Sequence, residues 1–222
     1  MLVRAMTGIV VTTALLAALL FGGAGTLRYW QAWVFLGTFL ACFTVITFEL
    51  AMRDPALLAR RLEGGPFAEP MPVQKTIVAA VTLLWIALHL VPALDRRYGW
   101  SEMPAWLSLA GDAAIVIGNL GLAHVFRFNS HAAATVRVVE GQHVVETGPY
   151  ARVRHPMYAA GVPLFAGTAL ALGSWVDLLV FAAMVPLIAW RIADEEKLLA
   201  RDLPGYPGYC RRVTSRLVPG LW

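Results

Sequence analysis

Charged side chains are scarce in this chain. Asp, Glu, Lys and Arg make up 14% of its 222 residues, whereas soluble domains carry about 25%. Five long stretches hold no charged residue: 5–27, 29–48, 76–94, 103–111 and 155–176. A soluble domain does not tolerate so many uncharged runs, and a bilayer core needs roughly 20 apolar residues per helix. The composition therefore predicts an all-α polytopic membrane protein.

Cysteines and several well-known catalytic motifs are also missing. The two cysteines, Cys42 mid-helix and Cys210 in the C-terminal tail, are isolated, so neither a disulfide framework nor a cysteine-based metal site follows from them. There is no Walker phosphate loop, no HExxH and no GxSxG, and the glycines of "FGGAG" (21–25) follow no strand. His131 and His143 lack the spacing of metal ligands. We therefore expect no metal and no nucleic-acid partner.

The apolar stretches predict five to six transmembrane helices. We place helices at about 6–24, 30–51, 75–93, 104–126, 157–172 and 174–190. The last two form a helical hairpin that breaks near Gly173-Ser174. Each half of this hairpin is short for a full span, so it tilts or lies partly within the protein.

The distribution of basic residues predicts the orientation. If the N-terminus is inside, 15 of the 18 Lys and Arg residues fall in inner segments, and Arg28, Arg96 and Arg97 alone lie outside. Cytoplasmic loops are enriched in Lys and Arg. We therefore expect both termini in the cytosol and a protein integral to a membrane, the inner membrane of a bacterium.

The chain divides into N-terminal transmembrane helices (1–126) and a C-terminal region with loop, hairpin and tail (127–222). In the loop, apolar residues alternate around Glu140-Gly141, which suggests two short extended pieces. In the tail, one apolar stripe predicts a terminal helix, and it contains Tyr206, Tyr209, Val213 and Leu217. "PALLARRL" in 52–74 reads as a short interfacial helix.

Ionisable residues meet at both ends of the predicted hairpin. Arg154 and His155 precede its first helix, and Glu195 and Glu196 follow its second, so all four converge at one cytosolic mouth. Arg191 lies one turn before Glu195 and is expected to pair with it. Clustered ionisable groups beside an apolar cleft indicate a binding site. Each feature also has an interpretation without a binding site. Arg152 alone is typical of a lipid-headgroup anchor, and Glu-Glu-Lys (195–197) alone is typical of a solvated helix face.

Two motifs carry a family resemblance. "VVETGPYARVRHPMYAAG", about 20 apolar residues, and then "RIADEEKLLARDLPGYPGYCRRV" closely resemble the integral-membrane methyltransferases. These are the isoprenylcysteine carboxyl methyltransferase and phospholipid N-methyltransferase group, and the likeness covers residues 129–219. The N-terminal part is more similar to bacterial members. The resemblance implies S-adenosylmethionine bound in a cytosolic cleft and a lipid-like acceptor that enters from the bilayer.

The resemblance also implies roles for individual residues. Those expected to bind the cofactor are Val145, Gly148, Tyr150, Arg154, His155, Tyr158, Glu195 and Glu196. Arg191 and Glu195 are the expected catalytic residues. The tail residues expected to close the site are Tyr206, Tyr209 and Arg212. Carboxylates suit the ammonium and ribose hydroxyls of the cofactor, and arginine suits a carboxylate.

Two other functions stay open at this point. One is an NADPH-dependent membrane reductase of the sterol reductase type, which has a similar helical C-terminal architecture. The other is a lipid-binding or transport protein without catalysis, although transporters place ionisable groups near mid-membrane. His89 lies mid-span and reads as a helix-contact residue. The identity of the acceptor, carboxylate or amine, and the oligomeric state also stay open.

Overall fold

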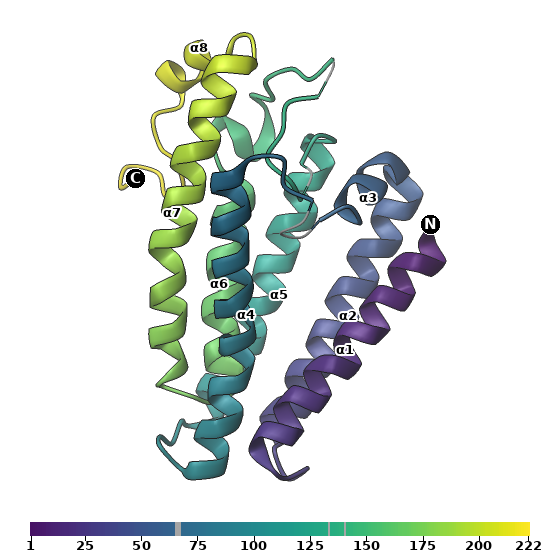
Figure 1. Ribbon diagram of the computed structural model, residues 1–222, viewed down its shortest axis with the longest axis vertical. Helices are drawn as coiled ribbons and strands as arrows, with labels where there is room; N and C mark the ends of the chain where they lie inside the picture. The colour runs from purple at the N-terminus through teal and green to yellow at the C-terminus, as the bar shows by residue number, and fades with distance from the viewer. Residues whose placement is uncertain (65–67, 133, 140) are drawn as a thin grey trace.

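The computed structural model describes residues 1–222 except 65–67, 133 and 140. Its helices are α1 (Leu2–Ala24), α2 (Trp30–Arg53), α3 (Pro55–Arg61), α4 (Pro72–Tyr98), α5 (Ala105–Phe128), the 3₁₀ turn η1 (Gly148–Ala151), α6 (Pro156–Ala171), α7 (Asp177–Asp202) and α8 (Tyr206–Arg212). The long helices run side by side, and α3, α8 and the 129–155 loop lie at one end, shown at the top of Figure 1. Both termini lie in that half of the molecule (Figure 1). The predicted all-α polytopic membrane fold is confirmed.

Four of the described helices, α1, α2, α4 and α5, are long and apolar enough to cross a bilayer. Helix α6 is apolar and has 16 residues, which is about 24 Å at 1.5 Å per residue. The apolar part of α7, residues 178–190, is also short, and its polar part, residues 191–202, extends beyond it. The short hairpin halves were expected from the sequence.

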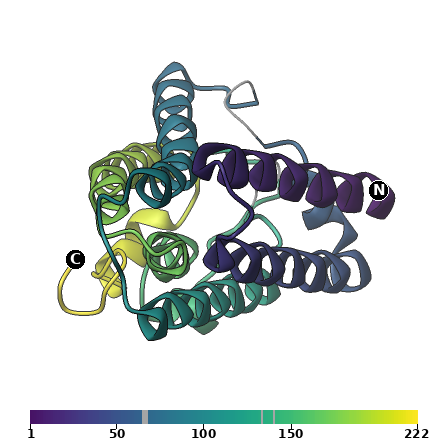
Figure 2. The same cartoon turned by 90° about the horizontal axis from the view of Figure 1, so that it is seen from below.

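Helix α6 lies in the middle of the bundle. It contacts α2, α4, α5 and α7, and the view along the helices shows these neighbours around it (Figure 2). Small residues let α5 and α6 approach closely, because a Cβ added at Gly111 would lie 2.3 Å from the backbone nitrogen of Ala171. A Cβ added at Gly118 would lie 2.8 Å from the carbonyl oxygen of Ala160. Such close backbone approach is a common way for membrane helices to associate.

The predicted hairpin between α6 and α7 is present. Gly173, at φ 77°, takes a left-handed conformation that residues with a side chain rarely adopt. The ring of Tyr29 is buried beside the turn, and its hydroxyl donates to the carbonyl of Leu172 at 2.6 Å. This contact ties the hairpin turn to the start of α2, so the far end of the bundle is fixed.

In the described part of 127–156, where two short extended pieces with a turn were expected, Gly141 lies in a turn and no residue forms a strand; Glu140 itself lies outside the described residues. The prediction for the tail is wrong. The terminal helix α8 ends at Arg212. Val213 and Leu217 therefore leave the helical stripe, and Tyr206 and Tyr209 alone bury their rings. "PALLARRL" does form a short helix, α3, whose first turn is capped by the Asp54 carboxylate at the Leu57 amide (2.9 Å).

His89 packs between helices. It is 2% exposed, its Nδ1 lies 2.7 Å from the carbonyl oxygen of Trp85, and its ring lies against the rings of Phe35 and Trp85. This geometry fits the helix-contact role expected from the sequence.

Candidate functional site

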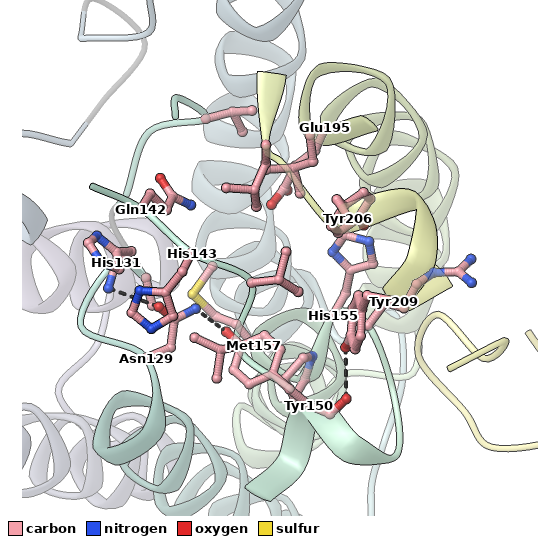
Figure 3. Close-up of a pocket in the computed structure, with 18 of the residues that line it drawn as sticks. Asn129, His131, Gln142, His143, Tyr150, His155, Met157, Glu195, Tyr206 and Tyr209 are labelled. Atoms are coloured by element: carbon pink, nitrogen blue, oxygen red, sulfur yellow. Dashed lines mark hydrogen bonds between the residues drawn. The ribbon is translucent and has the colours of Figure 1, made fainter. Parts of the chain in front are cut away.

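A polar cleft opens where the 129–155 loop meets α6, α7 and α8. Its cavity volume is about 110 Å³. Figure 3 shows that side chains from the loop, the start of α6, the polar part of α7 and α8 all point toward this space. Its polar lining residues are Asn129, His131, Thr135, Arg137, Gln142, His143, Tyr150, Arg154, His155, Tyr158, Glu195, Tyr206 and Tyr209. Two ends of the α6–α7 hairpin thus meet at one cleft, as their positions in the sequence predicted.

Tyr158, on the first turn of α6, links the cleft to the helices behind it. Its hydroxyl donates to Glu195 Oε2 at 2.8 Å and accepts from Arg191 Nε at 2.9 Å. Arg191 then reaches away from the cleft, where Nη2 lies 2.7 Å from Glu69 Oε1 and Nη1 lies 2.9 Å from Gln74 Oε1. Glu69 is 2% exposed, so this ion pair is largely shielded from water.

The expected ion pair between Arg191 and Glu195 is therefore wrong. The two residues lie one turn apart on α7, but the buried carboxylate of Glu69 competes for the guanidinium and wins because burial strengthens the attraction between opposite charges. The hydroxyl of Tyr158 stands between the two side chains and contacts both. Glu195 is left facing the cleft.

Glu196 holds three cationic or titratable side chains together. Its Oε1 accepts from Arg154 Nε at 2.8 Å and lies 3.2 Å from His155 Nε2, and its Oε2 accepts from Arg216 Nε at 2.9 Å. Although burial raises the pKa of Glu196, the hydrogen bonds from His155 and Arg216 and the nearby charge of Arg154 outweigh it and lower this pKa to about 2. Glu196 lies in the polar part of α7 and does not line the cleft.

Backbone contacts attach the C-terminal segment to the start of α6. Nη1 of Arg154 donates to the carbonyls of Val213 and Thr214, both at 3.0 Å. The amides of Arg154 and His155 donate to the carbonyls of Ser215 and Arg216 at 3.0 and 2.9 Å. The segment that follows α8 thus positions Arg154 and His155, the two residues directly before α6.

Tyrosines close the cleft from the loop and from α8. The hydroxyl of Tyr150 accepts from Asn129 Nδ2 at 2.7 Å, and the hydroxyl of Tyr209 donates to the carbonyl of Tyr150 at 2.7 Å. Burial raises the pKa of Tyr150 to about 12 and raises that of Tyr209 well above its ordinary value. Both phenols therefore stay protonated at neutral pH.

Three buried polar atoms at this cleft have no hydrogen-bond partner among the described residues. They are Nδ1 of His131, Oγ1 of Thr135 and the hydroxyl oxygen of Tyr206. His131 and His143 face each other edge-on with ring centroids 5.9 Å apart (Figure 3). Buried polar groups are normally satisfied, so these atoms mark places where a bound polar ligand would complete the hydrogen bonding.

The structure brings most of the predicted site residues together. Val145, Tyr150, Arg154, His155, Tyr158 and Glu195 line the cleft, as do the tail residues Tyr206 and Tyr209. Three predicted residues lie behind the lining or beside it: Gly148, Arg191 and Glu196. A Cβ at Gly148 would lie 2.5 Å from the Phe128 ring, so this glycine shapes the loop. Arg212 pairs with Glu146 at the surface.

Several site residues were not predicted from the sequence. The loop residues Asn129, His131, Gln142 and His143 line the cleft, and Glu69 anchors Arg191 from a segment some 120 residues earlier. Nothing local marks Glu69, because its burial depends on contacts distant in the sequence. Among the described residues, no group of three or more His, Cys, Asp or Glu is arranged to hold a metal ion.

This arrangement defines a helical membrane protein with a polar cleft at one end of the bundle. Comparison with known proteins shows which family part of the chain resembles. Residues 106–203, which contain α5, α6, α7 and the loop between them, match the family model described as phospholipid methyltransferase. The resemblance to the integral-membrane methyltransferase group is confirmed for this region, which covers under half of the chain.

One relative is named for metal resistance and not for methyl transfer. The chain is 26% identical over 155 residues to a nickel-cobalt-cadmium resistance protein, NccN, of Alcaligenes xylosoxydans xylosoxydans. The aligned part covers 67% of this chain and 69% of that protein.

Proposed function

We propose that the protein transfers a methyl group from S-adenosylmethionine to a lipid-like acceptor at the membrane interface. The observation that carries this proposal is that the family-matched region and the polar cleft occupy the same part of the molecule. The region that matches the phospholipid methyltransferase family builds the cleft in which ionisable side chains and unsatisfied polar atoms meet. The acceptor group is a carboxylate or an amine, and either reacts as a nucleophile at a methyl sulfonium.

The chemistry of the lining residues fits this cofactor. The carboxylate of Glu195 suits an ammonium or ribose hydroxyls, and the unsatisfied atoms of His131, Thr135 and Tyr206 suit the hydroxyls and the base of a nucleoside. His155 lies at the start of α6, where it suits the carboxylate of the amino-acid part. When bound, the cofactor supplies an activated methyl group, and the protein contributes orientation and electrostatics.

Arg191 and Glu195 have different parts in this proposal. Glu195 faces the cleft and contacts the ligand, whereas Arg191 lies behind Tyr158 and acts on Glu195 through that hydroxyl. Arg191 is therefore a positioning residue. Glu196 is also one, because it holds Arg154 and His155 in place.

The cleft must widen to accept the cofactor. Its volume of about 110 Å³ is below the range of roughly 300–1,000 Å³ that ligand pockets have. We propose that the side chains of His131, Gln142 and His143 shift outward on binding, since α6 and α7 are held by the bundle. The protein lies in a bacterial inner membrane with its cleft and both termini in the cytosol, as the basic residues favour.

Calorimetric titration of the purified protein with S-adenosylhomocysteine, and separately with NADPH, tests the proposal. We expect saturable binding of the first ligand and none of the second. Glu195→Gln should weaken binding by about tenfold or more, because it removes a charged hydrogen-bond acceptor. The matched control is Glu102→Gln, an exposed glutamate just beyond α4 at the opposite end. Binding of NADPH alone would overturn the methyltransferase reading.

A further inference from the structure

A second cavity lies between α2 and α5, at the same end of the bundle as the cleft. Its volume is about 290 Å³. Figure 1 shows the α1–α2 pair diverging from α5 toward this end. Four apolar residues form its walls: Ile46, Leu50, Ala123 and Phe126. Charged residues surround its outer end, where α2 and α5 reach their last turns: Glu49, Arg53, Asp54 and Arg127.

We propose that this groove binds a phospholipid, with the phosphate between Arg53 and Arg127 and an acyl chain along the apolar walls. Arginine presents several N–H groups in a planar fork and suits phosphate well. The order of residues from helix end to helix middle, first cationic and then apolar, matches the order of groups in a phospholipid from headgroup to chain.

The charges at the outer end leave capacity for an anion. Glu49 Oε1 lies 2.7 Å from Arg127 Nε and 3.6 Å from Arg53 Nε, so one carboxylate bridges two arginines. Within the described residues, no protein group accepts from the Nη atoms of either arginine. Asp54 directs its carboxylate to the Leu57 amide at the start of α3. Glu49 thus holds the two guanidinium groups side by side without satisfying them.

The surroundings of the groove favour a lipid over a soluble anion. Apolar side chains on the same stretches of α2 and α5 are exposed: Val45 is 65% exposed, Phe48 46% and Leu120 65%. In a membrane protein such residues face hydrocarbon. The groove therefore opens sideways into the bilayer, and an occupant that enters it carries an apolar chain.

Packed side chains of one apolar cluster, which includes Phe126, Ala132 and Met157, lie between this groove and the polar cleft. The guanidinium of Arg61 lies 4.4 Å from the centre of the Phe126 ring, which lines the groove. Its Nη1 lies 3.8 Å from Sδ of Met157, which lines the cleft. In this proposal the acceptor lipid binds in the groove before it reaches the cleft. This role of the groove rests on the proposed function.

Native mass spectrometry of the detergent-purified full chain, titrated with dioctanoyl phosphatidylglycerol, tests the groove. The variant Arg53→Gln/Arg127→Gln should bind this lipid about tenfold or more weakly, because two charged contacts to phosphate are lost. The matched control, Arg96→Gln/Arg97→Gln, makes the same charge change in the last turn of α4, at the end of the bundle away from the groove. It should bind like the wild type. Glu49→Gln should bind as tightly or more tightly, since it frees Arg127. Equal weakening by both double variants, or loss of binding in Glu49→Gln, would refute the phosphate site.

Two further ligands distinguish the source of the phosphate. Dioctanoylglycerol, which lacks the phosphate, should bind the wild type about tenfold or more weakly than the phosphatidylglycerol. Inorganic phosphate at millimolar concentration should not displace the lipid. Displacement by inorganic phosphate would contradict a lipid site and point to a site for free anions.

Photo-crosslinking of the wild type avoids any dependence on variants that fail to fold. A phosphatidylglycerol with a diazirine in its acyl chain should label peptides from residues 43–53 and 120–128. Labelling spread evenly over all apolar helices would overturn the proposal, because it would indicate ordinary surrounding lipid. None of these measurements includes the methyl donor. Lipid binding without S-adenosylhomocysteine binding would therefore defeat the proposed function alone, and the opposite result would defeat the groove alone.

Discussion

Arg191 and Glu195 lie one helical turn apart on α7 and do not pair; the hydroxyl of Tyr158 contacts them both. Arg191 Nε donates to this hydroxyl at 2.9 Å, and the hydroxyl donates to Glu195 at 2.8 Å. The relay fixes the cleft-facing carboxylate against a buried ion pair that involves Glu69. A phenol thus connects the interior of the protein to the surface where a ligand would bind.

Tyr158→Phe should break the hydrogen-bonded connection between Arg191 and Glu195. Loss of the hydroxyl removes one hydrogen bond from Arg191 and one from Glu195, and each bond to a charged group contributes about 1.5–3 kcal/mol. We expect a lower melting temperature in detergent and weaker S-adenosylhomocysteine binding, because Glu195 loses its orientation. Tyr98→Phe, at an exposed tyrosine at the end of α4, is the control and should change neither property. Equal melting temperatures for Tyr158→Phe and wild type would show that the relay does not stabilise the fold.

Glu196→Gln should release the start of α6 from the tail. Arg154, His155 and Arg216 would lose the carboxylate that they share. Breaking a fully buried ion pair costs about 3–5 kcal/mol; because the Glu196 side chain is 15% exposed, we expect about 2–3 kcal/mol, measured by thermal unfolding. Limited proteolysis should also cut the 213–218 segment faster. Arg152→Gln, an exposed arginine beside the same turn, should behave like the wild type.

Acidification should reproduce the effect of Glu196→Gln. The pKa of Glu196 is lowered from its ordinary 4.5 to about 2 in the folded protein. A lowered folded-state pKa contributes stability that is fully present above pH 4.5 and is lost as the pH falls through 2. Between pH 5 and pH 3 the wild type should therefore lose more thermal stability than Glu196→Gln does. Parallel slopes for the two proteins would contradict the assigned pKa.

Gly111→Ala should weaken the contact between α5 and α6. The added Cβ would lie 2.3 Å from the Ala171 backbone nitrogen, and backbone has no rotamer by which to move away. Overpacking of this kind costs about 1–3 kcal/mol. Gly8→Ala in α1 meets no atom within 4 Å and should be neutral or stabilising, because alanine favours helix over glycine. Thermal unfolding of both variants checks the prediction, and a Gly111→Ala protein as stable as Gly8→Ala would show that the helices are not in close contact.

Labelling of introduced cysteines should show the C-terminal end and the cleft loop in the cytosol. In a chain lacking Cys42 and Cys210, Arg152→Cys and Trp222→Cys should react with an impermeant maleimide only after the membrane is opened. Arg97→Cys, at the opposite end of α4, should react in intact cells. The physical reason is the 15-to-3 division of basic residues. Labelling of position 152 in intact cells would reverse the orientation.

The sequence predicts the long helices well because their signal is local. Uncharged stretches locate α1, α2, α5 and α6 to within a few residues. Helix α4 was predicted at 75–93 and spans Pro72–Tyr98. It continues through the charged residues Asp95, Arg96 and Arg97, because its end is set by the left-handed Gly99 and not by the end of the apolar run.

The candidate site was predicted in part for the same reason. The turn before α6 and the polar part of α7 are marked by motifs, so Arg154, His155 and Glu195 were found. Glu69, the ion-pair partner of Arg191, was missed, because a buried ion pair between distant segments leaves no periodic pattern in either one. The alternation near Gly141 predicted extended pieces and a turn, and Gly141 does lie in a turn, but a paired strand would need a second strand alongside.

The attachment of the C-terminal segment to the start of α6 also sets an order of events during synthesis. Arg154 donates to the carbonyl of Thr214, 60 residues later in the chain. While a ribosome is still adding α7, these carbonyls do not yet exist. The contacts that hold Arg154 and His155 can therefore form only after translation has passed residue 216, and a chain that stops before it lacks them.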